Sequence, residues 1–588
     1  MGMFTPRKQR ATYKLSAAYS KKHEFSGENT VKPSFKRLVL VTAVATALAA
    51  CDGDDGRDGT DGAAGAPGSD GLTSLIVQTD LPSGDSNCRA GGTRVDSGID
   101  DSGDGTLDSG EIDATTFVCN GEDGASAAEL ALIQQVLETN ADIAFAAYSD
   151  SVDTARALSD AIDTFAGART QENLDAAKMA WLVAREPYGQ TEVYRFRLSP
   201  IDSTDYTEED GPEGEINAWP LGEALIDYVV TSESTLDDFE FDQVGVTTSS
   251  TPINGGGQVT GEEMPAINII ASDVPITADL LSGTASADDE RDVIAGYHAI
   301  EFLLWGQDLN NNGVVTTGAD REMAVKTAAA PNLAMGGQRP LEDFTSNPGA
   351  DRRIEFLQVA VAKLIADLES VTAGWEDGVD GNYRDQFTTF LDVDEAKERL
   401  TQILTGMGTL SEGELAGERM QIAFSANSQE DEHSCFADNT HRDILLNYVG
   451  IANSFYGDYS GYDANLNGMD DDGDNTARAV SGYGFDDYAA DVGGELATVA
   501  AALDAALAVT AGDVGDIDAA ARSGSPVDVL IQDANRTDPD NPMRAAILSL
   551  NAQSAEIAAL AEALDIDDQV VDDDASGCDT TNPDEECG

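Results

Sequence analysis

A stretch of ten residues, Gly296–Trp305, is apolar almost all round and has no glycine or proline after its first residue. A helix that is hydrophobic on every side is typical of a protein core, so the pattern predicts a buried helix at about residues 288–306. His298 and Glu301 stand three residues apart in it and therefore share one helix face. Burial of an ionised carboxylate is unfavourable unless a partner or a metal compensates. The pair therefore predicts either a His–Glu hydrogen bond inside the core or two ligands of a metal ion.

Helical periodicity also dominates most of the chain around this stretch. A capping box, Ser126-Ala127-Ala128-Glu129, opens a long pattern that runs to Ala166, and a second pattern starts near Thr170 and should be kinked by Pro187. Further helices are expected at residues 351–373, 393–408, 411–428, 438–453, 487–509 and 540–565, with mixed or loop-like sequence at 199–290 and 319–348. Because no sustained alternation of polar and apolar residues appears, the pattern predicts an all-α fold of two helical bundles in tandem.

Length and charge narrow the class of protein. A chain of 588 residues is too long for one hydrophobic core and is expected to form about two to four units. Asp and Glu number 108 against 34 Lys and Arg, which gives a net charge of -74 at pH 7. Such a chain repels nucleic acid and anionic lipid surfaces, so neither is expected as a partner. The acidic residues are spread along the chain, which indicates a solvated surface suited to salt or to cations.

The N-terminal region has the pattern of an export signal. A basic pair, Lys36-Arg37, precedes a short apolar run at residues 38–47 and the tetrapeptide Leu48-Ala49-Ala50-Cys51. This order resembles the signal of a bacterial lipoprotein. A membrane-spanning helix would need about 20 apolar residues, more than this run provides. We therefore expect residues 1–50 to be a signal peptide and Cys51 to carry a lipid that anchors the protein in the cell envelope, in the periplasm or on the outer surface.

A glycine at every third position marks residues 53–71. Because Pro67 is the one proline in that stretch, a collagen helix is disfavoured and a flexible acidic tether at residues 51–71 is expected. Export permits disulfides. The expected pairs are Cys88 with Cys119 and Cys578 with Cys587, which leaves Cys435 as a thiol or a soft metal ligand.

The segment at residues 100–111 has the spacing of an EF-hand calcium loop. Oxygen ligands fall at loop positions one, three, five, seven, nine and twelve, which are Asp100, Ser102, Asp104, Thr106 (through its carbonyl), Asp108 and Glu111. Gly105 stands at position six, where the sharp turn requires glycine, and Leu107 at position eight. The pattern predicts a calcium site in a small module at residues 72–122, clipped by the first cysteine pair and without convincing flanking helices. An acidic turn is the alternative.

Two further loops are weaker. Residues 463–474 offer Asp463, Asn465, Asn467 and Asp474 as calcium ligands, but the loop ends in Asp rather than Glu. The segment Asp308-Leu309-Asn310-Asn311-Asn312-Gly313 begins in the same way, yet Ala319 stands at position twelve. It is therefore an incomplete loop or only an Asn-Gly turn.

A second group of metal-ligating residue types lies at residues 430–441, which read Glu430-Asp431-Glu432-His433-Ser434-Cys435-Phe436-Ala437-Asp438-Asn439-Thr440-His441. Imidazole, thiolate and carboxylate within a dozen residues can bind a transition metal. The alternative is a polar helix start, in which Asp438 or Asn439 caps the helix that follows. No C-x-x-C or H-x-x-x-H motif decides between the two.

Common catalytic motifs are missing from the sequence. A zinc protease needs H-E-x-x-H or H-x-x-E-H, and here Phe302 follows Glu301 where a second histidine would stand. Cys435 with His433 or His441 is conceivable as a nucleophile and base, but nothing resembles an oxyanion site. There is no phosphate loop and no dinucleotide fingerprint. Whether the protein is an enzyme stays open at this point, and metal binding without catalysis is favoured.

Several blocks together resemble the imelysin family. Gly296-x-His298-x-x-Glu301 is similar to the G-x-H-x-x-E motif of these bacterial iron-regulated proteins, which are periplasmic or lipid-anchored. Further blocks are Ala180-Trp181-Leu182, residues 185–196, Gly211-Pro212-Glu213-Gly214, Asn217-Ala218-Trp219-Pro220-Leu221, Gly336-Gly337-Gln338-Arg339-Pro340, residues 413–419 and residues 430–441. The resemblance covers about residues 126–565 and is closest to the branch called iron-regulated protein A.

The resemblance implies a duplicated four-helix-bundle fold, with bundles at residues 123–345 and 346–565 and an acidic tail at 566–588. It also implies a site between the halves, where the histidine and the glutamate of the motif meet. The family is classified among metallopeptidases, although a role in iron or haem acquisition is the usual inference.

The leading prediction is a lipid-anchored protein that binds iron, or another transition metal or its complex, in iron acquisition. The expected ligands are His298 and Glu301, with Glu186, Glu432 and His433 as candidates to complete the set. Imidazole and carboxylate suit iron, zinc and copper alike. The alternatives are a metallopeptidase with Glu301 or Glu186 as its base, and a purely structural contact between His298 and Glu301. Expected partners are the metal ion or complex, the membrane through the lipid anchor, and iron-uptake proteins.

Overall fold

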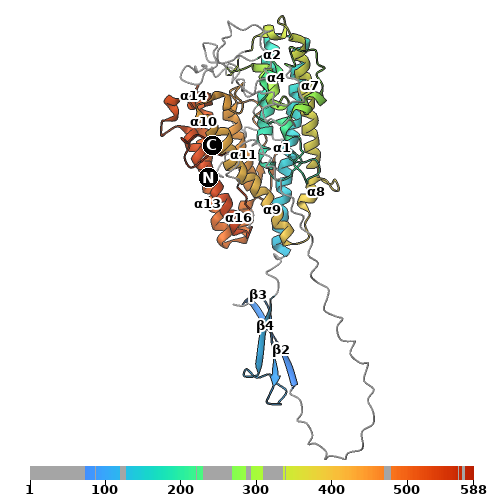
Figure 1. Ribbon diagram of the computed structural model, residues 1–588, viewed down its shortest axis with the longest axis vertical. Helices are drawn as coiled ribbons and strands as arrows, with labels where there is room; N and C mark the ends of the chain where they lie inside the picture. The colour runs from blue at the N-terminus through green and yellow to red at the C-terminus, as the bar shows by residue number, and fades with distance from the viewer. Residues whose placement is uncertain are drawn as a thin grey trace, which may run out of the picture. The chain divides into compact units, whose positions relative to one another are not determined.

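The computed structural model describes residues 73–85, 88–119, 127–219, 221–228, 268–285, 293–308, 336–337, 339–468, 478–566, 569–571 and 577–587. These residues belong to a β unit that ends by Gly124 and to a helical unit that begins at Ala125, and each is described by itself (Figure 1). The predicted signal peptide, lipid attachment at Cys51 and tether lie outside the described residues.

The β unit is a three-stranded antiparallel sheet in the order β2-β3-β4. The strands are β2 (Thr73–Asp85), β3 (Cys88–Asp100) and β4 (Ile112–Cys119), and the predicted calcium loop connects β3 to β4. The register shifts at Gly98, where a Cβ atom would lie 1.8 Å from the Glu111 carbonyl oxygen. Glycine is therefore required at the place where the loop folds back on the sheet. The sequence predicts the loop but not the strands around it, because β3 carries few β-branched or aromatic residues.

The cysteines are described in part. The structure contains a disulfide between Cys578 and Cys587, and Cys435 is a buried thiol. The side chains of Cys88 and Cys119 lie outside the described residues, so their pairing stays a prediction.

The helical unit consists of α-helices with short 3₁₀ segments and one π-helix. In chain order they are α1 (Ala127–Gly167), α2 (Gln171–Gly189), η1 (Glu192–Tyr194), α3 (Glu213–Ile216), α4 (Glu223–Ile226), α5 (Ala278–Ala285), α6 (Gly296–Trp305), η4 (Leu341–Phe344), α7 (Ala350–Gly374), α8 (Tyr383–Thr388), α9 (Val393–Thr409), the π-helix η5 (Leu410–Gln421), α10 (Ile422–Ala426), η6 (Gln429–Asp431), α11 (Thr440–Tyr456), α12 (Phe485–Val492), α13 (Gly494–Arg522), α14 (Val527–Leu530), α15 (Asp533–Arg536) and α16 (Pro542–Ala563). In the described part of this unit the strands form one small ribbon, β5 (Asp458–Tyr459) with β6 (Val480–Ser481). The mostly helical fold confirms the predicted class, whereas the division into two tandem four-helix bundles stays a prediction.

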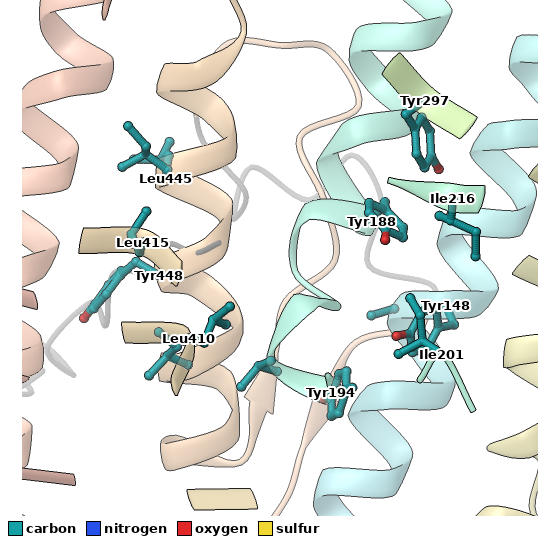
Figure 2. Close-up of a cluster of buried hydrophobic side chains, with 14 of the residues drawn as sticks. Tyr148, Tyr188, Tyr194, Ile201, Ile216, Tyr297, Leu410, Leu415, Leu445 and Tyr448 are labelled. Atoms are coloured by element: carbon teal, nitrogen blue, oxygen red, sulfur yellow. The ribbon is translucent and has the colours of Figure 1, made fainter. Parts of the chain in front are cut away.

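Two groups of helices share one hydrophobic core. Helices α1, α2 and α7 pack side by side, and so do α11, α13, α16 and η5 (Figure 1). Buried apolar residues of both groups belong to a single cluster. Figure 2 shows part of it, with Tyr148, Tyr188 and Tyr297 on the α1 and α2 side and Leu415 and Tyr448 near α11. The core therefore runs across the helical unit without a break between its N-terminal and C-terminal halves.

Helix α2 continues through Pro187 and ends two residues later, so this proline lies in the last turn of the helix. Two other helix boundaries differ from the sequence prediction. Residues 393–426 form one continuous helical stretch, because the π-helix joins α9 to α10 where a break was expected. The predicted helix at 487–509 is instead interrupted at Gly493 and Gly494, whose φ angles of 77° and 66° no ordinary residue adopts easily.

Helix α13 has the length and hydropathy of a membrane span, and no other helix in the described ranges does. It packs against α11, α12 and α16. Because core helices of globular proteins meet the same criterion, the observation is weak evidence for a span.

Candidate metal centre

Helix α6 positions the first two residues of the site. Its first residue, Gly296, has a φ of 77° and would bring a Cβ atom to 2.2 Å from the Ile216 carbonyl oxygen, so the helix can begin here only with glycine. His298 and Glu301 are both fully buried. The Nδ1 atom of His298 lies 2.9 Å from Oε2 of Glu301, as neighbours three residues apart on one helix face should.

A second histidine completes the centre from a distant part of the chain. His433 lies between η6 and α11, and its Nε2 atom faces the Nε2 atom of His298 at 2.9 Å. Its Nδ1 atom is 2.7 Å from Oδ2 of Asp443 on α11. Each imidazole therefore turns Nδ1 to a carboxyl group and Nε2 to the other imidazole. The structure thus brings together His298, Glu301 and His433, which the sequence offers as separate candidates.

Both carboxyl oxygens of Glu301 take part in this arrangement. Oε2 faces His298, and Oε1 accepts a hydrogen bond from the backbone N–H of Ala437 at 2.8 Å. Burial raises the pKa of Glu301 well above its usual range, against the lowering effect of that backbone bond. Burial also lowers the pKa of the His298 imidazole, and the positive charge of Arg185 adds to the effect. Both shifts act against a charge on Glu301 and on His298 in the protein without a bound ion.

Asp443, which lies against His433, accepts several hydrogen bonds. Its Oδ1 accepts from Nη2 of Arg185 at 2.9 Å and from Nε at 3.3 Å, and its Oδ2 accepts from His433 and from the Ser434 hydroxyl. Arg185 and Asp443 are each 1% exposed, so this ion pair is shielded from solvent. Arg185 also donates to the side-chain oxygen of Asn217. A buried charge needs such partners, and together they fix the orientation of the His433 ring.

Aromatic side chains surround the two imidazoles. The Trp219 ring packs edge to face on His298 at 5.1 Å between centroids and lies 5.6 Å from Phe436. Phe436 in turn packs on Phe302 at 5.1 Å. Trp219 is only half-buried, whereas His298 and Phe436, on which it packs, are fully buried. The centre is therefore a polar pair in an apolar enclosure whose more accessible wall is Trp219.

Glu186, predicted as a weaker ligand, belongs to a different ion pair. Its two oxygens accept from Nε and Nη2 of Arg442 at 2.8 and 2.6 Å. Arg442 also lies 3.6 Å from Asp518 and 4.0 Å from Asp463. The bidentate pair with Arg442 compensates the buried charge of Glu186.

Two other candidate ligands in residues 430–441, Glu432 and His441, are buried as well. Glu432 is 1% exposed and precedes His433 in the chain, so it stays a candidate third ligand. His441 instead directs Nδ1 to the Asp438 carbonyl oxygen at 3.0 Å, and its Nε2 lies 3.8 Å from Asp518. The third histidine of the helical unit therefore has partners outside the pair.

Nine basic side chains are buried in the described part of the helical unit: Lys178, Arg185, Arg195, Arg197, Arg339, Arg353, Lys363, Arg419 and Arg442. Most of them meet buried carboxylates; Arg339 and Arg353, for example, each approach one Asp227 oxygen to 2.6 Å. Arg195 and Arg419 lie 3.7 and 3.5 Å from Glu414 of the π-helix. The interior therefore holds a dispersed set of ion pairs, of which Arg185–Asp443 touches the histidines.

The first calcium-type loop folds on its own backbone. Asp100 accepts from the N–H groups of Gly103 and Gly105 at 2.6 and 2.9 Å, and the Gly105 bond is the main reason why the pKa of Asp100 is lowered. Glu111 accepts from the N–H groups of Ser102 and Asp108 at 2.8 and 3.0 Å. The carboxylates at loop positions one and twelve thus close the loop from both ends.

The second loop repeats part of this geometry. Asp463 accepts from the N–H groups of Asn467 and Gly468 at 3.1 and 2.6 Å, so the glycine at position six binds the first aspartate as it does in the first loop. Asp474 lies outside the described residues. The nearby Arg442 already offers Asp463 a positive charge, which argues against a strong cation site here.

Sequence reasoning missed the residues that orient the imidazoles. Asp443 and Arg185 are 258 positions apart, and no local pattern predicts that they meet. One signal was present: α11 is buried along its whole length, although Arg442 and Asp443 interrupt its apolar pattern. Charged residues in a helix without an exposed face indicate internal ion pairs or a site.

Known family models match a segment in each of the two units. Residues 144–566 match the family model described as Imelysin, and residues 73–119 match a domain of unknown function, DUF7151. A segment of 64 residues is 39% identical to a protein named iron-regulated protein A from Synechococcus elongatus. That segment is 11% of this chain and 16% of the relative, so the chain spans about a sixth of that protein.

Two solved structures match this chain at low sequence identity. One is an iron-regulated protein A precursor from Parabacteroides distasonis, 15% identical, with a TM-score of 0.46 over 75% of this chain and 96% of that one. The other is an imelysin-like protein from Psychrobacter arcticum, 14% identical, with a TM-score of 0.43 over 74% and 96%. The family model, in contrast, matches more than half of the chain, including the G-x-H-x-x-E motif and His433. The chain therefore belongs to the imelysin family.

Proposed function

We propose that this protein binds a transition metal ion, with iron as the favoured ion, through Nε2 of His298 and Nε2 of His433. The observation that carries the proposal is the opposed pair of imidazoles, each held at Nδ1 by a carboxyl group. Histidine ligands of metals nearly always donate their second ring nitrogen to a carboxylate or carbonyl, which fixes the tautomer with Nε2 available. In this protein Nδ1 of His298 lies against Glu301 and Nδ1 of His433 against Asp443, and the two Nε2 atoms face each other.

The donor set fits a metal ion of this class. Two nitrogen ligands about 2.0–2.1 Å from one ion lie roughly 2.9 Å apart at a right angle and about 3.4 Å apart at a tetrahedral angle. The observed separation of 2.9 Å between the two Nε2 atoms is therefore already in the range of a shared ion. If both Nδ1 atoms carry protons, two lone pairs meet at this distance, and they repel each other unless a cation lies between them.

Glu301 acts in this proposal as the group that orients His298 rather than as a ligand, because both of its oxygens are hydrogen-bonded. Glu432 is the candidate for a third ligand, since it is buried and adjacent to His433. Nitrogen and carboxylate ligands suit iron, zinc and copper. The preference for iron comes from the relatives named iron-regulated protein A.

We further propose a place for this binding. The lipid anchor at Cys51 would hold the protein in the cell envelope, where an imported metal ion or its complex passes and where iron-uptake proteins are the natural partners. The metallopeptidase alternative is weaker, because it needs a carboxylate free to act as a base. Both oxygens of Glu301 and of Glu186 are hydrogen-bonded instead.

The loop between β3 and β4 supports a second proposal, that the β unit binds calcium. The ligand spacing at residues 100–111 is complete, and Asp100 and Glu111 hold the loop closed through its backbone amides. A calcium ion would replace these amide contacts with oxygen coordination.

The test of the histidine pair compares metal content and affinity of the full chain with those of His298→Ala and His433→Ala. Iron(II) under anaerobic conditions, zinc and copper are titrated calorimetrically after chelator treatment. We expect one tightly bound ion in the wild type and a loss of affinity of more than about 100-fold in each variant, since each removes one of two ligands. His441→Ala is the matched control, because it removes a buried histidine outside the pair and should retain the metal.

Helicity, measured by circular dichroism, shows whether each variant is folded. If the wild type binds no transition metal, or if His433→Ala binds it as tightly as His441→Ala does, the proposal is wrong. The contact between His298 and Glu301 would then be a hydrogen bond of the core.

A further inference from the structure

One half-buried aromatic side chain covers the two imidazoles of the proposed metal centre. His298 and His433 are 0% and 1% exposed, and Phe436 beside them is fully buried. Trp219 is half-buried and packs on both imidazoles, with its ring centroid 5.1 Å from that of His298 and 6.4 Å from that of His433. Among the described aromatic rings that pack on the pair, Trp219 is therefore the one with access to solvent.

The backbone that carries Trp219 is fixed on both sides of it. Asn217, two residues before, is 1% exposed and accepts a hydrogen bond from Arg185. Leu221, two residues after, is fully buried and forms a parallel β-bridge with Val293. Because both flanks are anchored, the indole can leave the imidazoles by rotation of its own side chain while the loop stays in place.

The distance between the imidazoles limits the kind of ligand that they can share. The two axial nitrogen ligands of a haem iron stand on opposite faces of the porphyrin, roughly 4 Å apart when each is about 2.0 Å from the metal. The Nε2 atoms of His298 and His433 are only 2.9 Å apart and face each other directly. This separation suits neighbouring positions on a single ion and leaves no room for a porphyrin between the two rings.

Aromatic rings also fill the space around the pair. The ring centroids of His298 and His433 are 4.4 Å apart, and Phe436 lies 5.6 Å from Trp219 and 5.1 Å from Phe302. Rings at such separations are in contact. A drug-sized ligand, in comparison, typically occupies a cavity of about 300–1,000 Å³. The described contacts therefore take up the place that a porphyrin beside the imidazoles would need.

We propose that the histidine pair takes a bare divalent transition-metal ion rather than haem, and that this ion enters and leaves past Trp219. The inference rests on the metal binding proposed above and names the class of its ligand. Imidazole nitrogen is an ordinary ligand of divalent first-row ions, whereas the indole of Trp219 offers no metal ligand. Trp219 therefore controls the rate of exchange rather than the affinity. A side chain that raises only the barrier slows entry and release by the same factor.

The test of Trp219 uses the full chain and zinc, which has no redox chemistry. Zinc-loaded wild type, Trp219→Ala and Trp219→Phe are mixed with a chromogenic chelator in a stopped-flow instrument, and calorimetric titration gives their affinities. His298→Ala identifies zinc that is bound elsewhere on the chain. We expect zinc release to be at least about tenfold faster in Trp219→Ala and intermediate in Trp219→Phe, with affinities within about threefold of the wild type.

Phe145→Ala is the matched control, because it removes another half-buried aromatic ring, on α1, that is not part of the metal centre. It should release zinc at the wild-type rate. Circular dichroism shows whether each variant is folded, and Trp219→Phe keeps the test decisive if Trp219→Ala is unfolded. Equal release rates in the wild type and in the folded Trp219 variants overturn the role of Trp219 and leave the metal site intact. Faster release with an equal loss of affinity also overturns it, because the indole would then only stabilise the bound state.

Haemin is the probe for the excluded ligand. The Soret absorption band of haemin, titrated into the wild type and into His433→Ala, should be the same in both, because the imidazoles do not reach the haem iron. A shift of this band in the wild type that is lost in His433→Ala overturns the choice of a bare ion. A wild type that binds no transition metal at all overturns the proposed function and this inference together.

Discussion

Asp443→Asn is the substitution that most directly tests the buried charge behind the histidine pair. Asp443 receives hydrogen bonds from Arg185, His433 and Ser434, and the guanidinium of Arg185 stays buried whether or not the carboxylate is present. Removing one partner of a buried ion pair typically costs about 3–5 kcal/mol, because the remaining charge is desolvated and uncompensated. In addition, the asparagine amide would turn donors toward Nδ1–H of His433 or toward Arg185.

We therefore expect Asp443→Asn to lower the free energy of unfolding by about 3–5 kcal/mol in urea denaturation at pH 7. The transition-metal affinity should fall by about 10–100-fold, because His433 loses the group that fixes its tautomer. Asp516→Asn, which changes an exposed carboxylate on α13, should alter the unfolding free energy by less than about 0.5 kcal/mol.

A double-mutant cycle with Arg185→Met separates the ion pair from general loss of packing. If the two charges compensate each other, the double variant is less destabilised than the sum of the single variants by at least about 1.5 kcal/mol. Additive effects, or a cost below about 1 kcal/mol for Asp443→Asn, would refute the argument that the pair is held in a low-dielectric interior.

Two further predictions concern groups away from the histidines. Burial lowers the pKa of Lys178 from 10.5 to about 8, so below pH 8 the folded protein holds a buried charge, and stability rises as the pH increases from about 8 to 10.5. Lys178→Met should therefore raise the free energy of unfolding by up to about 3 kcal/mol at pH 7, and this gain over the wild type should vanish near pH 11. A gain that is the same at every pH in urea denaturation would contradict the prediction. In the β unit, calcium should slow proteolysis between residues 73 and 119, and chelator should reverse the effect in the wild type but not in Asp100→Asn/Asp104→Asn. Equal cleavage rates with and without chelator would show that the loop is only an acidic turn.

The buried helix with His298 and Glu301 could be predicted from sequence because its evidence is local. An apolar run without a polar face indicates burial, and a spacing of three residues places the two side chains together. The calcium-type loop was predictable for the same reason. The meeting of His298 with His433 was not, because it depends on how α6 packs against a segment 135 residues away. Sequence spacing gives no register for such a contact.

Other differences have equally physical causes. Glu186 has the residue type of a ligand, and only the position of Arg442 shows that it is an ion-pair partner. The break between α12 and α13 depends on two adjacent glycines at positive φ, whereas glycines elsewhere in α13 remain helical. Propensity alone cannot separate these cases, since tertiary contacts decide which glycine leaves the helix.

The buried basic residues also affect how the protein meets its ligand. Nine of the 34 lysines and arginines are in the interior of the described helical unit, so they contribute little to the charge at the surface. The outer face is consequently poorer in positive charge than the composition suggests. A negative field around the protein concentrates small cations and accelerates their encounter with it, while repelling anionic complexes. Salt screens this field. The protein should therefore bind a bare metal cation fastest at low ionic strength, whereas an anionic metal complex should bind faster at high ionic strength.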